Sequence, residues 1–79
     1  MLHRVDGDLH IEQVPLQEIA AQYGTPTYVY SDSAIRQAYM EFERCFTRQS
    51  HAICYAVKAN SNIAILQILV ELGAGFDIV

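Results

Sequence analysis

The sequence predicts an α/β fold, because its second half reads as a strand, a helix and a second strand in succession. Residues 52–59 form an apolar run that only Tyr55 and Lys58 interrupt, as in a parallel strand that is covered on both faces. Apolar residues then recur at helical spacing over 63–72, and residues 75–79 return to a strand pattern. This order and spacing predict a βαβ unit with a right-handed crossover in a parallel sheet.

Residues 1–30 are predicted to form a leading segment that contains a hairpin, a short helix and a short strand. Asp6-Gly7-Asp8 lies between two short apolar pieces, which is typical of a hairpin turn. Pro15 suits the first position of a helix, and Gly24 is suited to end it. Residues 27–30 are rich in strand formers, so we expect a short strand there.

Residues 31–79 are predicted to be the first strand and helix units of a larger α/β domain. Ser31-Asp32-Ser33 offers a capping hydroxyl and an acidic first turn to a long helix. An apolar stripe along that helix is expected to pack against the protein core and not to bind a ligand. Its members are Ile35, Ala38, Tyr39, Phe42 and Phe46. Asn60 or Ser61 can cap the following helix, which we expect to be nearly buried.

The composition favours a piece of a globular, cytoplasmic protein. The chain has 79 residues, of which 52% are hydrophobic and 18% charged, with a net charge of −4. Its Lys and Arg residues do not cluster, so no nucleic-acid partner is expected. No signal-peptide pattern follows Met1 and no apolar run could span a bilayer, so no membrane partner is expected. Cys45 and Cys54 lack metal-like spacing and are expected to be reduced, buried thiols.

His3 and His10 lie on either side of the predicted hairpin turn. Histidine is a common metal ligand, but the spacing brings no third ligand within reach of these two. We therefore predict exposed strand histidines and no metal site.

Lys58 is the residue that most needs an explanation. An ammonium group among apolar atoms costs on the order of several kcal/mol unless it is paired or neutralised. Alternation along a strand would place Lys58 on one face with Ala56 and Cys54, where small side chains leave room for a flat ligand. The carboxyl end of such a strand is where α/β folds place their chemistry. A buried, neutral amine can attack a carbonyl to form a Schiff base, whereas the alternative is a lysine that extends its amine into water.

The segment Tyr55-Ala-Val-Lys58-Ala-Asn60 resembles the lysine motif of the barrel-type (fold type III) enzymes that depend on pyridoxal 5′-phosphate. This group includes alanine racemase and the ornithine, arginine and diaminopimelate decarboxylases. Residues 59–62 and 73–79 are most similar to the diaminopimelate decarboxylases, and the resemblance also covers residues 14–20 and 24–30. It implies the amino-terminal portion of a (β/α)₈ TIM-type barrel, which is incomplete in this chain because a whole barrel needs about 250 residues.

The resemblance implies roles for three residues of the chain. Lys58 is expected to be catalytic and to bind pyridoxal 5′-phosphate through its amine. Ala56 is expected to lie against the cofactor ring, where a larger side chain would crowd it. Asp77 is expected to point into the barrel near Lys58 and to bind at the cofactor site, the alternative being a solvated aspartate at a strand end. The implied reaction converts meso-diaminopimelate, a small amino acid, into L-lysine and carbon dioxide in lysine biosynthesis, and the implied enzyme is a homodimer.

Because the chain ends within an apparent strand, we expect an amino-terminal piece that is inactive alone, with an unprotected edge strand at residues 75–79. Other readings stay open. The parent protein could be an ornithine or arginine decarboxylase or an alanine racemase, or the chain could be a non-catalytic fragment that retains the fold. A nucleotide-binding α/β domain is disfavoured, since no glycine-rich phosphate loop follows either strand.

Overall fold

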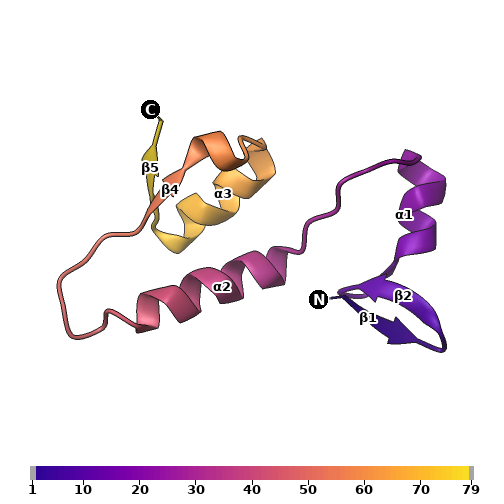
Figure 1. The fold of residues 1–79 in the computed structure, drawn as a ribbon, viewed down its shortest axis with the longest axis horizontal. Helices are drawn as coiled ribbons and strands as arrows, with labels where there is room; N and C mark the ends of the chain where they lie inside the picture. Colours follow the sequence, from indigo (N-terminus) through magenta and orange to yellow (C-terminus); the bar gives the residue numbers. More distant parts are fainter. Residues whose placement is uncertain (1, 79) are drawn as a thin grey trace. The chain divides into compact units, whose positions relative to one another are not determined.

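The computed structural model describes residues 2–78 and divides the chain into two compact units, Met1–Ser33 and Ala34–Val79. In chain order the elements are β1 (Leu2–Val5), β2 (Asp8–Ile11), β3 (Val14–Pro15), α1 (Leu16–Tyr23), α2 (Asp32–Arg44), β4 (Cys54–Ala56), the 3₁₀ turn η1 (Val57–Ala59), α3 (Ile63–Leu72) and β5 (Gly75–Asp77) (Figure 1). Each unit has its own small sheet, three-stranded in the first and two-stranded in the second.

The first unit is built on the predicted hairpin of β1 and β2. The strands are antiparallel, with Val5 opposite Asp8 on either side of a two-residue turn. Asp6 and Gly7 both have positive φ, 52° and 86°, which is the requirement of a type I′ turn, whose twist matches that of the strands it joins. Gly7 meets this requirement without a steric penalty, since it has no Cβ. β3, which the sequence pattern did not predict, follows a second turn at Glu12 and pairs with β2.

Glu12 connects this corner of the sheet to the end of the first unit. The backbone N–H of Ser33 donates a hydrogen bond to Glu12 Oε1 at 3.0 Å. Hydrogen bonds from the Ser33 hydroxyl and from this N–H lower the pKa of the Glu12 carboxyl, because they stabilise its charged form. A lowered pKa means that the contribution to stability is present above the ordinary carboxyl pKa and is lost as the pH falls through the lowered value.

The helix of the first unit has the predicted end but not the predicted start. Pro15 precedes α1 in an extended conformation, with ψ 133°, and is not its first helical residue. Gly24 ends the helix, and its N–H donates to the carbonyl oxygen of Ala20 at 2.9 Å. The strand predicted over residues 27–30 is wrong. Strand formers need a neighbouring strand for their backbone groups, and the described part of the chain provides none for this segment.

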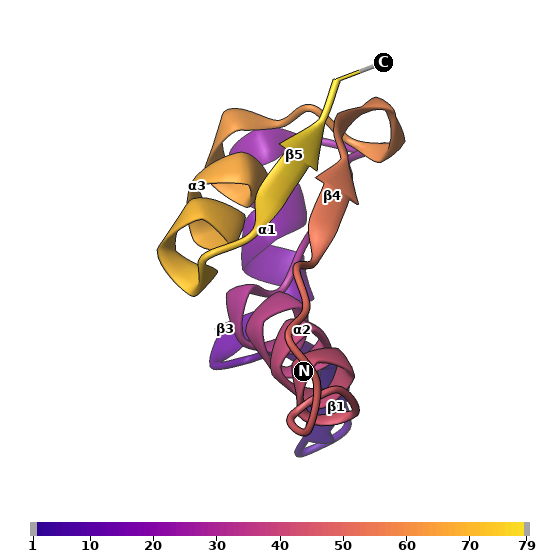
Figure 2. The same ribbon diagram turned by 90° about the vertical axis from the view of Figure 1, so that its left-hand side faces the viewer.

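The second unit contains the predicted βαβ arrangement. β4 and β5 are parallel, with Cys54 opposite Gly75 and Ala56 opposite Asp77, and α3 makes the crossover between them. Figure 2 shows the two strands side by side and pointing the same way. β4 is shorter than the predicted strand over residues 52–59, because the chain curls into η1 directly after Ala56.

The ends of α3 are fixed by side-chain and backbone geometry. Asn62 caps the helix, its side-chain oxygen accepting a hydrogen bond from the Ala64 N–H at 2.9 Å. The predicted caps, Asn60 and Ser61, are therefore wrong by one or two residues. Asn60 instead shapes the preceding turn, since its side-chain oxygen accepts from the Asn62 N–H at 2.9 Å. Gly73 ends the helix as predicted, in the left-handed conformation with φ 90°.

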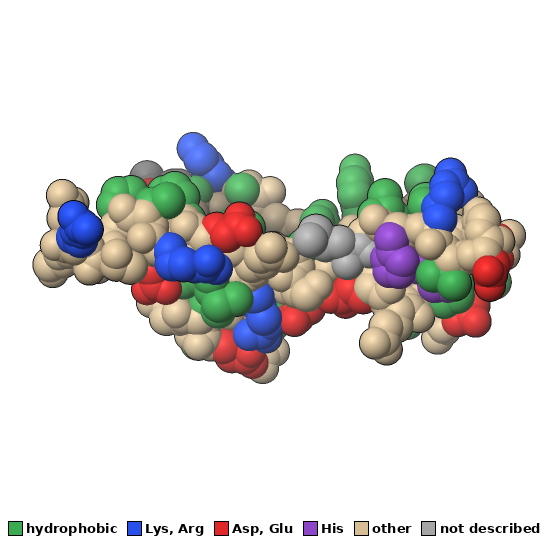
Figure 3. Space-filling model, turned by 90° about the horizontal axis from the view of Figure 1, so that it is seen from below, with side chains coloured by type: hydrophobic (Ala, Val, Ile, Leu, Met, Phe, Trp, Pro, Cys, Tyr) green, Lys and Arg blue, Asp and Glu red, His purple; other side chains and the backbone are tan. Residues whose placement is uncertain are grey.

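The apolar core that the chain forms by itself is small. Among the described residues, the buried apolar side chains are Ile65 and Leu69, 8% and 6% exposed, one turn apart on α3. The prediction of a nearly buried helix is wrong for this chain, since Ile63 is 75% exposed. The predicted core role of the α2 stripe is also wrong here for Phe42 and Phe46, which are both exposed. Apolar side chains accordingly appear on the surface in Figure 3, because two strands and two helices cannot cover one another on every side.

Polar contacts connect α2 to α3 and to the loop that follows α2. Arg36 donates to Glu71 of α3 with an N–O distance of 2.6 Å. His51 Nε2 lies 3.9 Å from Glu43 Oε1, and the His51 ring centroid lies 5.7 Å from that of Phe46. Ion pairs as exposed as these contribute at most about 1 kcal/mol each, so they orient α2 more than they stabilise it.

The cap at Asn62 gives a direct test of this local structure. Asn62→Ala is expected to lower the free energy of unfolding by about 1 kcal/mol, because the Ala64 N–H loses its acceptor. Asn62→Asp keeps an acceptor and should retain most of the stability. Ser61→Ala, one residue earlier, is the matched control and should change stability by less than about 0.5 kcal/mol. Urea unfolding followed by circular dichroism measures all three, and equal losses at positions 61 and 62 would contradict the cap assignment.

Candidate active site

Lys58 lies in the middle of η1, directly beyond the carboxyl end of β4. This end of the strand is where the sequence pattern placed it. The prediction that Lys58 is part of the strand is wrong, and its side chain is exposed. The turn removes Lys58 from the alternation of β4, and no described element covers it. The arrangement corresponds to the alternative of a lysine that extends its amine into water.

The turn that carries Lys58 is held by the residues on either side of it. The Tyr55 hydroxyl donates to the backbone carbonyl oxygen of Asn60 at 2.9 Å, spanning the turn. The Asn60 side chain accepts from the Asn62 N–H, which links the turn to the cap of α3. Tyr55 is half-buried, so its ring anchors this contact in the packed part of the unit. The sequence pattern assigned no role to Tyr55, although its position five residues before Asn60 in the lysine motif was a usable signal.

Ala56 and Asp77 come together at the same level of the sheet. They are register partners in β4 and β5, so their side chains share one face. Cys54 and Gly75 are the preceding pair on that face, and a Cβ atom at position 75 would lie 3.1 Å from Cys54 Sγ. The face beside the Lys58 turn is therefore made of small side chains, with one carboxylate at its edge.

These residues fit pyridoxal 5′-phosphate in their chemistry. A primary amine lies at the end of a strand, small side chains leave room beside it for a flat ring, and a carboxylate is on the same face. Lys58 would hold the cofactor through its amine, with Ala56 and Asp77 beside it. The described residues thus supply an attachment point and one wall, but not an enclosed pocket.

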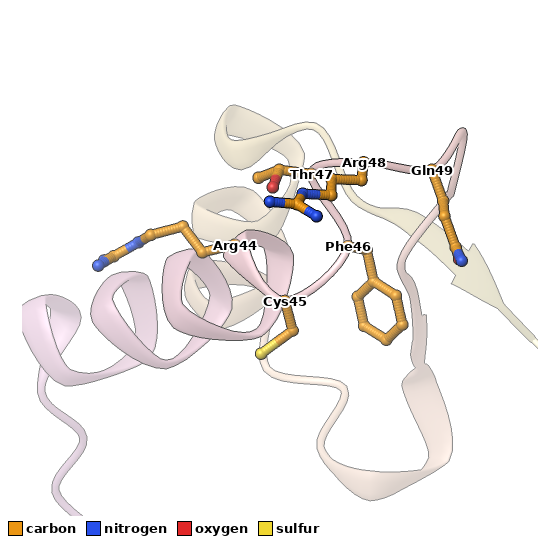
Figure 4. A pocket seen from close by; sticks show the side chains of 6 residues that line it. All are labelled: Arg44, Cys45, Phe46, Thr47, Arg48 and Gln49. Atoms are coloured by element: carbon orange, nitrogen blue, oxygen red, sulfur yellow. The ribbon is translucent and has the colours of Figure 1, made fainter.

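Two cavities of the second unit lie away from the candidate site residues. One of about 440 Å³ is lined by residues 44–49, at the end of α2 (Figure 4). In this view Arg44 points away from Arg48, so the two guanidinium groups do not converge on a common ligand. A second cavity of about 490 Å³ is lined by Met40, Glu43, Arg44, Thr47 and His51. Neither of these two cavities is lined by Lys58, Ala56 or Asp77.

The chain also carries metal-ligating and thiol side chains outside the three candidate residues. Within residues 2–78, no group of three or more His, Cys, Asp and Glu side chains could hold a metal ion. Cys45 and Cys54 are free thiols as predicted, but both are exposed, so the prediction that they are buried is wrong. Over the same range, no helix has the length and apolar character needed to cross a membrane.

Comparison with known proteins gives a consistent result. A family model described as "Pyridoxal-dependent decarboxylase, pyridoxal binding domain" matches residues 32–79, which include Lys58. The diaminopimelate decarboxylase of Vibrio cholerae is 51% identical over 77 residues, 98% of this chain. That of Pseudomonas fluorescens is 51% identical over 73 residues, 92% of the chain. A crystal structure of an Aquifex aeolicus protein matches 99% of this chain and 19% of its own, with a TM-score of 0.91 and 47% identity.

The chain spans about 18% of the length of the curated relatives it matches. Its α/β architecture is a piece of the barrel domain of these decarboxylases, as the resemblance implied, with sheets that are not closed within the described residues. The match extends over more than half of the chain and includes the lysine motif. The chain therefore belongs to the family of pyridoxal-dependent decarboxylases, within their pyridoxal-binding domain.

Proposed function

We propose that the protein to which this chain belongs decarboxylates meso-diaminopimelate to L-lysine and carbon dioxide, with pyridoxal 5′-phosphate bound at Lys58. The observation that carries the proposal is the position of Lys58, on a turn fixed at the carboxyl end of β4, inside the segment that the family model matches. The choice of substrate is supported by the names of relatives that are about half identical to this chain over the stretch that they match.

Lys58 is the only lysine in the chain. Lys58 would hold the cofactor covalently through its amine, which requires that the residue be placed at the edge of the small-residue face. The Tyr55 hydroxyl and the Asn60 side chain do this by fixing the backbone on both sides of Lys58. When bound, the cofactor supplies an electron sink for the negative charge left as the α-carboxylate departs.

Ala56 and Asp77 complete the part of the site that this chain supplies. Ala56 leaves space for the ring, since its side chain is a single methyl group on the face beside the amine. Asp77, its register partner, provides negative charge that favours the protonated form of a nearby nitrogen. Both roles concern binding and orientation, and neither residue needs to transfer a proton.

The parent enzyme is proposed to act as a cytoplasmic homodimer on a small amino-acid substrate. The exposed apolar side chains of α2 and α3 support coverage by further protein, either from the same polypeptide or from a second copy. Two free thiols are compatible with a reducing compartment.

Borohydride trapping tests the attachment of the cofactor. The full-length protein is incubated with pyridoxal 5′-phosphate, reduced with borohydride and mapped by peptide mass spectrometry. We expect one reduced cofactor per chain on the peptide that contains Lys58. Because this segment has no other lysine, Lys58→Ala should remove the adduct from it. A full-length protein that carries no adduct at Lys58 would contradict the assignment.

Release of carbon dioxide tests the reaction and the substrate. The full-length protein with cofactor is expected to release carbon dioxide from meso-diaminopimelate, and Lys58→Ala is expected to abolish this activity. The 79-residue chain with cofactor is expected to release none, because it provides one open wall of a site. Comparable kcat/KM on ornithine or arginine, or racemisation of alanine, would replace the proposed substrate by one of these alternatives.

The hydroxyl of Tyr55 is expected to matter for both the fold and the cofactor. Tyr55→Phe removes the hydrogen bond across the turn and should lower the free energy of unfolding by about 0.5–1.5 kcal/mol. The fraction of chain trapped at Lys58 should fall as well, because the turn is no longer fixed. Tyr39→Phe, which removes a hydroxyl from a half-buried tyrosine of α2, is the matched control. Equal effects of the two substitutions would show that the turn contact has no special role.

A further inference from the structure

His3 and His10 lie directly opposite each other in β1 and β2. Cross-strand partners project from the same face of a hairpin, and the ring centroids of these two are 5.8 Å apart with planes inclined by 31°. Histidine side chains stand at the surface in Figure 3, where ions can reach them. The hairpin thus presents two imidazoles side by side on one exposed face.

The His10 ring is oriented by the backbone. Its Nδ1 lies 3.1 Å from the carbonyl oxygen of Asp8, and a carbonyl can only accept, so Nδ1 carries the hydrogen. Nε2 is then the nitrogen with a free lone pair. Histidines that bind metals are commonly held in this way, with one ring nitrogen donating to a carbonyl and the other facing the ion.

We propose that His3 and His10 together bind one zinc ion or a similar divalent transition metal. Imidazole suits these ions, and zinc to nitrogen bonds are about 2.0–2.1 Å long. An ion between two rings whose centroids are 5.8 Å apart can reach one nitrogen of each by rotation of the side chains alone. Residues 2–78 contain no group of three or more ligating side chains, so water completes the coordination and binding is weaker than in a four-ligand structural site.

The bound ion would cross-link β1 to β2. A hairpin by itself is marginally stable, and here Leu2 and Val5 on its outer strand are exposed. An ion that binds the paired strands but not the unfolded chain stabilises the hairpin by an amount that grows with the ratio of the free ion concentration to Kd. This site lies wholly within the first unit and does not depend on the function proposed for Lys58.

Zinc titration followed by calorimetry tests the proposal. Cys45 and Cys54 are free thiols that also bind zinc, so the 79-residue chain is used with Cys45→Ser and Cys54→Ser. We expect one zinc ion per chain, with binding weakened by about 10- to 100-fold in His3→Ala and equally in His10→Ala. His51→Ala, which removes the third histidine of the chain, is the matched control and should leave binding unchanged.

A second variant separates binding from folding. His10→Phe keeps a ring opposite His3, so the hairpin should persist in the cross-strand contacts seen by nuclear magnetic resonance, while zinc binding is weakened as much as in His10→Ala. Zinc should also raise the thermal unfolding midpoint of the hairpin in the 79-residue chain with the two cysteine substitutions. The same rise is expected when His51→Ala is added, and a smaller one or none when His10→Phe is added. The proposal is overturned if His51→Ala weakens binding as much as His10→Ala does, or if His3→Ala abolishes binding while His10→Ala does not.

Discussion

The parallel pairing of β4 with β5 is the constraint on which the second unit depends. Parallel strands cannot be joined by a tight turn, so the chain must cross over, and α3 is that crossover. The crossover also supplies the buried apolar side chains of the described residues, Ile65 and Leu69. Because parallel strands end at the same edge, the turn with Lys58 and the carboxylate of Asp77 are brought to one edge of the sheet.

The departure of the chain from β4 depends on hydrogen bonds that follow one another along the backbone. Leaving a strand exposes carbonyl and N–H groups that need new partners. The Tyr55 hydroxyl satisfies the carbonyl of Asn60, the Asn60 side chain satisfies the N–H of Asn62, and the Asn62 side chain satisfies the N–H of Ala64. The short segment from strand to helix is therefore ordered although little of it is buried.

The features that could be predicted from the sequence are those that local backbone geometry decides. Asp6-Gly7 and Gly73 mark a turn and a helix end because positive φ is costly for most residues, and the structure has positive φ at all three. The spacing of apolar residues was sufficient to predict the βαβ unit. The burial of α3 and of Phe42 and Phe46 was predicted wrongly, and so was the strand at residues 27–30. These features need partner elements that the described residues do not contain.

In the candidate site, too, some features could be predicted from the sequence and others could not. Lys58 could be singled out because a lysine after an apolar strand is unusual, and its motif resembles a known one. Its 3₁₀ turn was not predicted, because the Tyr55 to Asn60 hydrogen bond that spans it was not considered in a pattern based on strand alternation. Strand alternation gave the wrong neighbours for Lys58, but the correct shared face for Ala56 and Cys54.

An exposed lysine on an open sheet face leaves the activation of its amine to be explained. A neutral amine is favoured where water is excluded or where another cation lies close by. In the described residues, the face beside Lys58 carries small side chains and the carboxylate of Asp77, and the lysine side chain is exposed. The exclusion of water must therefore come from protein or cofactor that covers this edge of the sheet. This chain fixes where the amine is held, and what covers it decides when the amine can react.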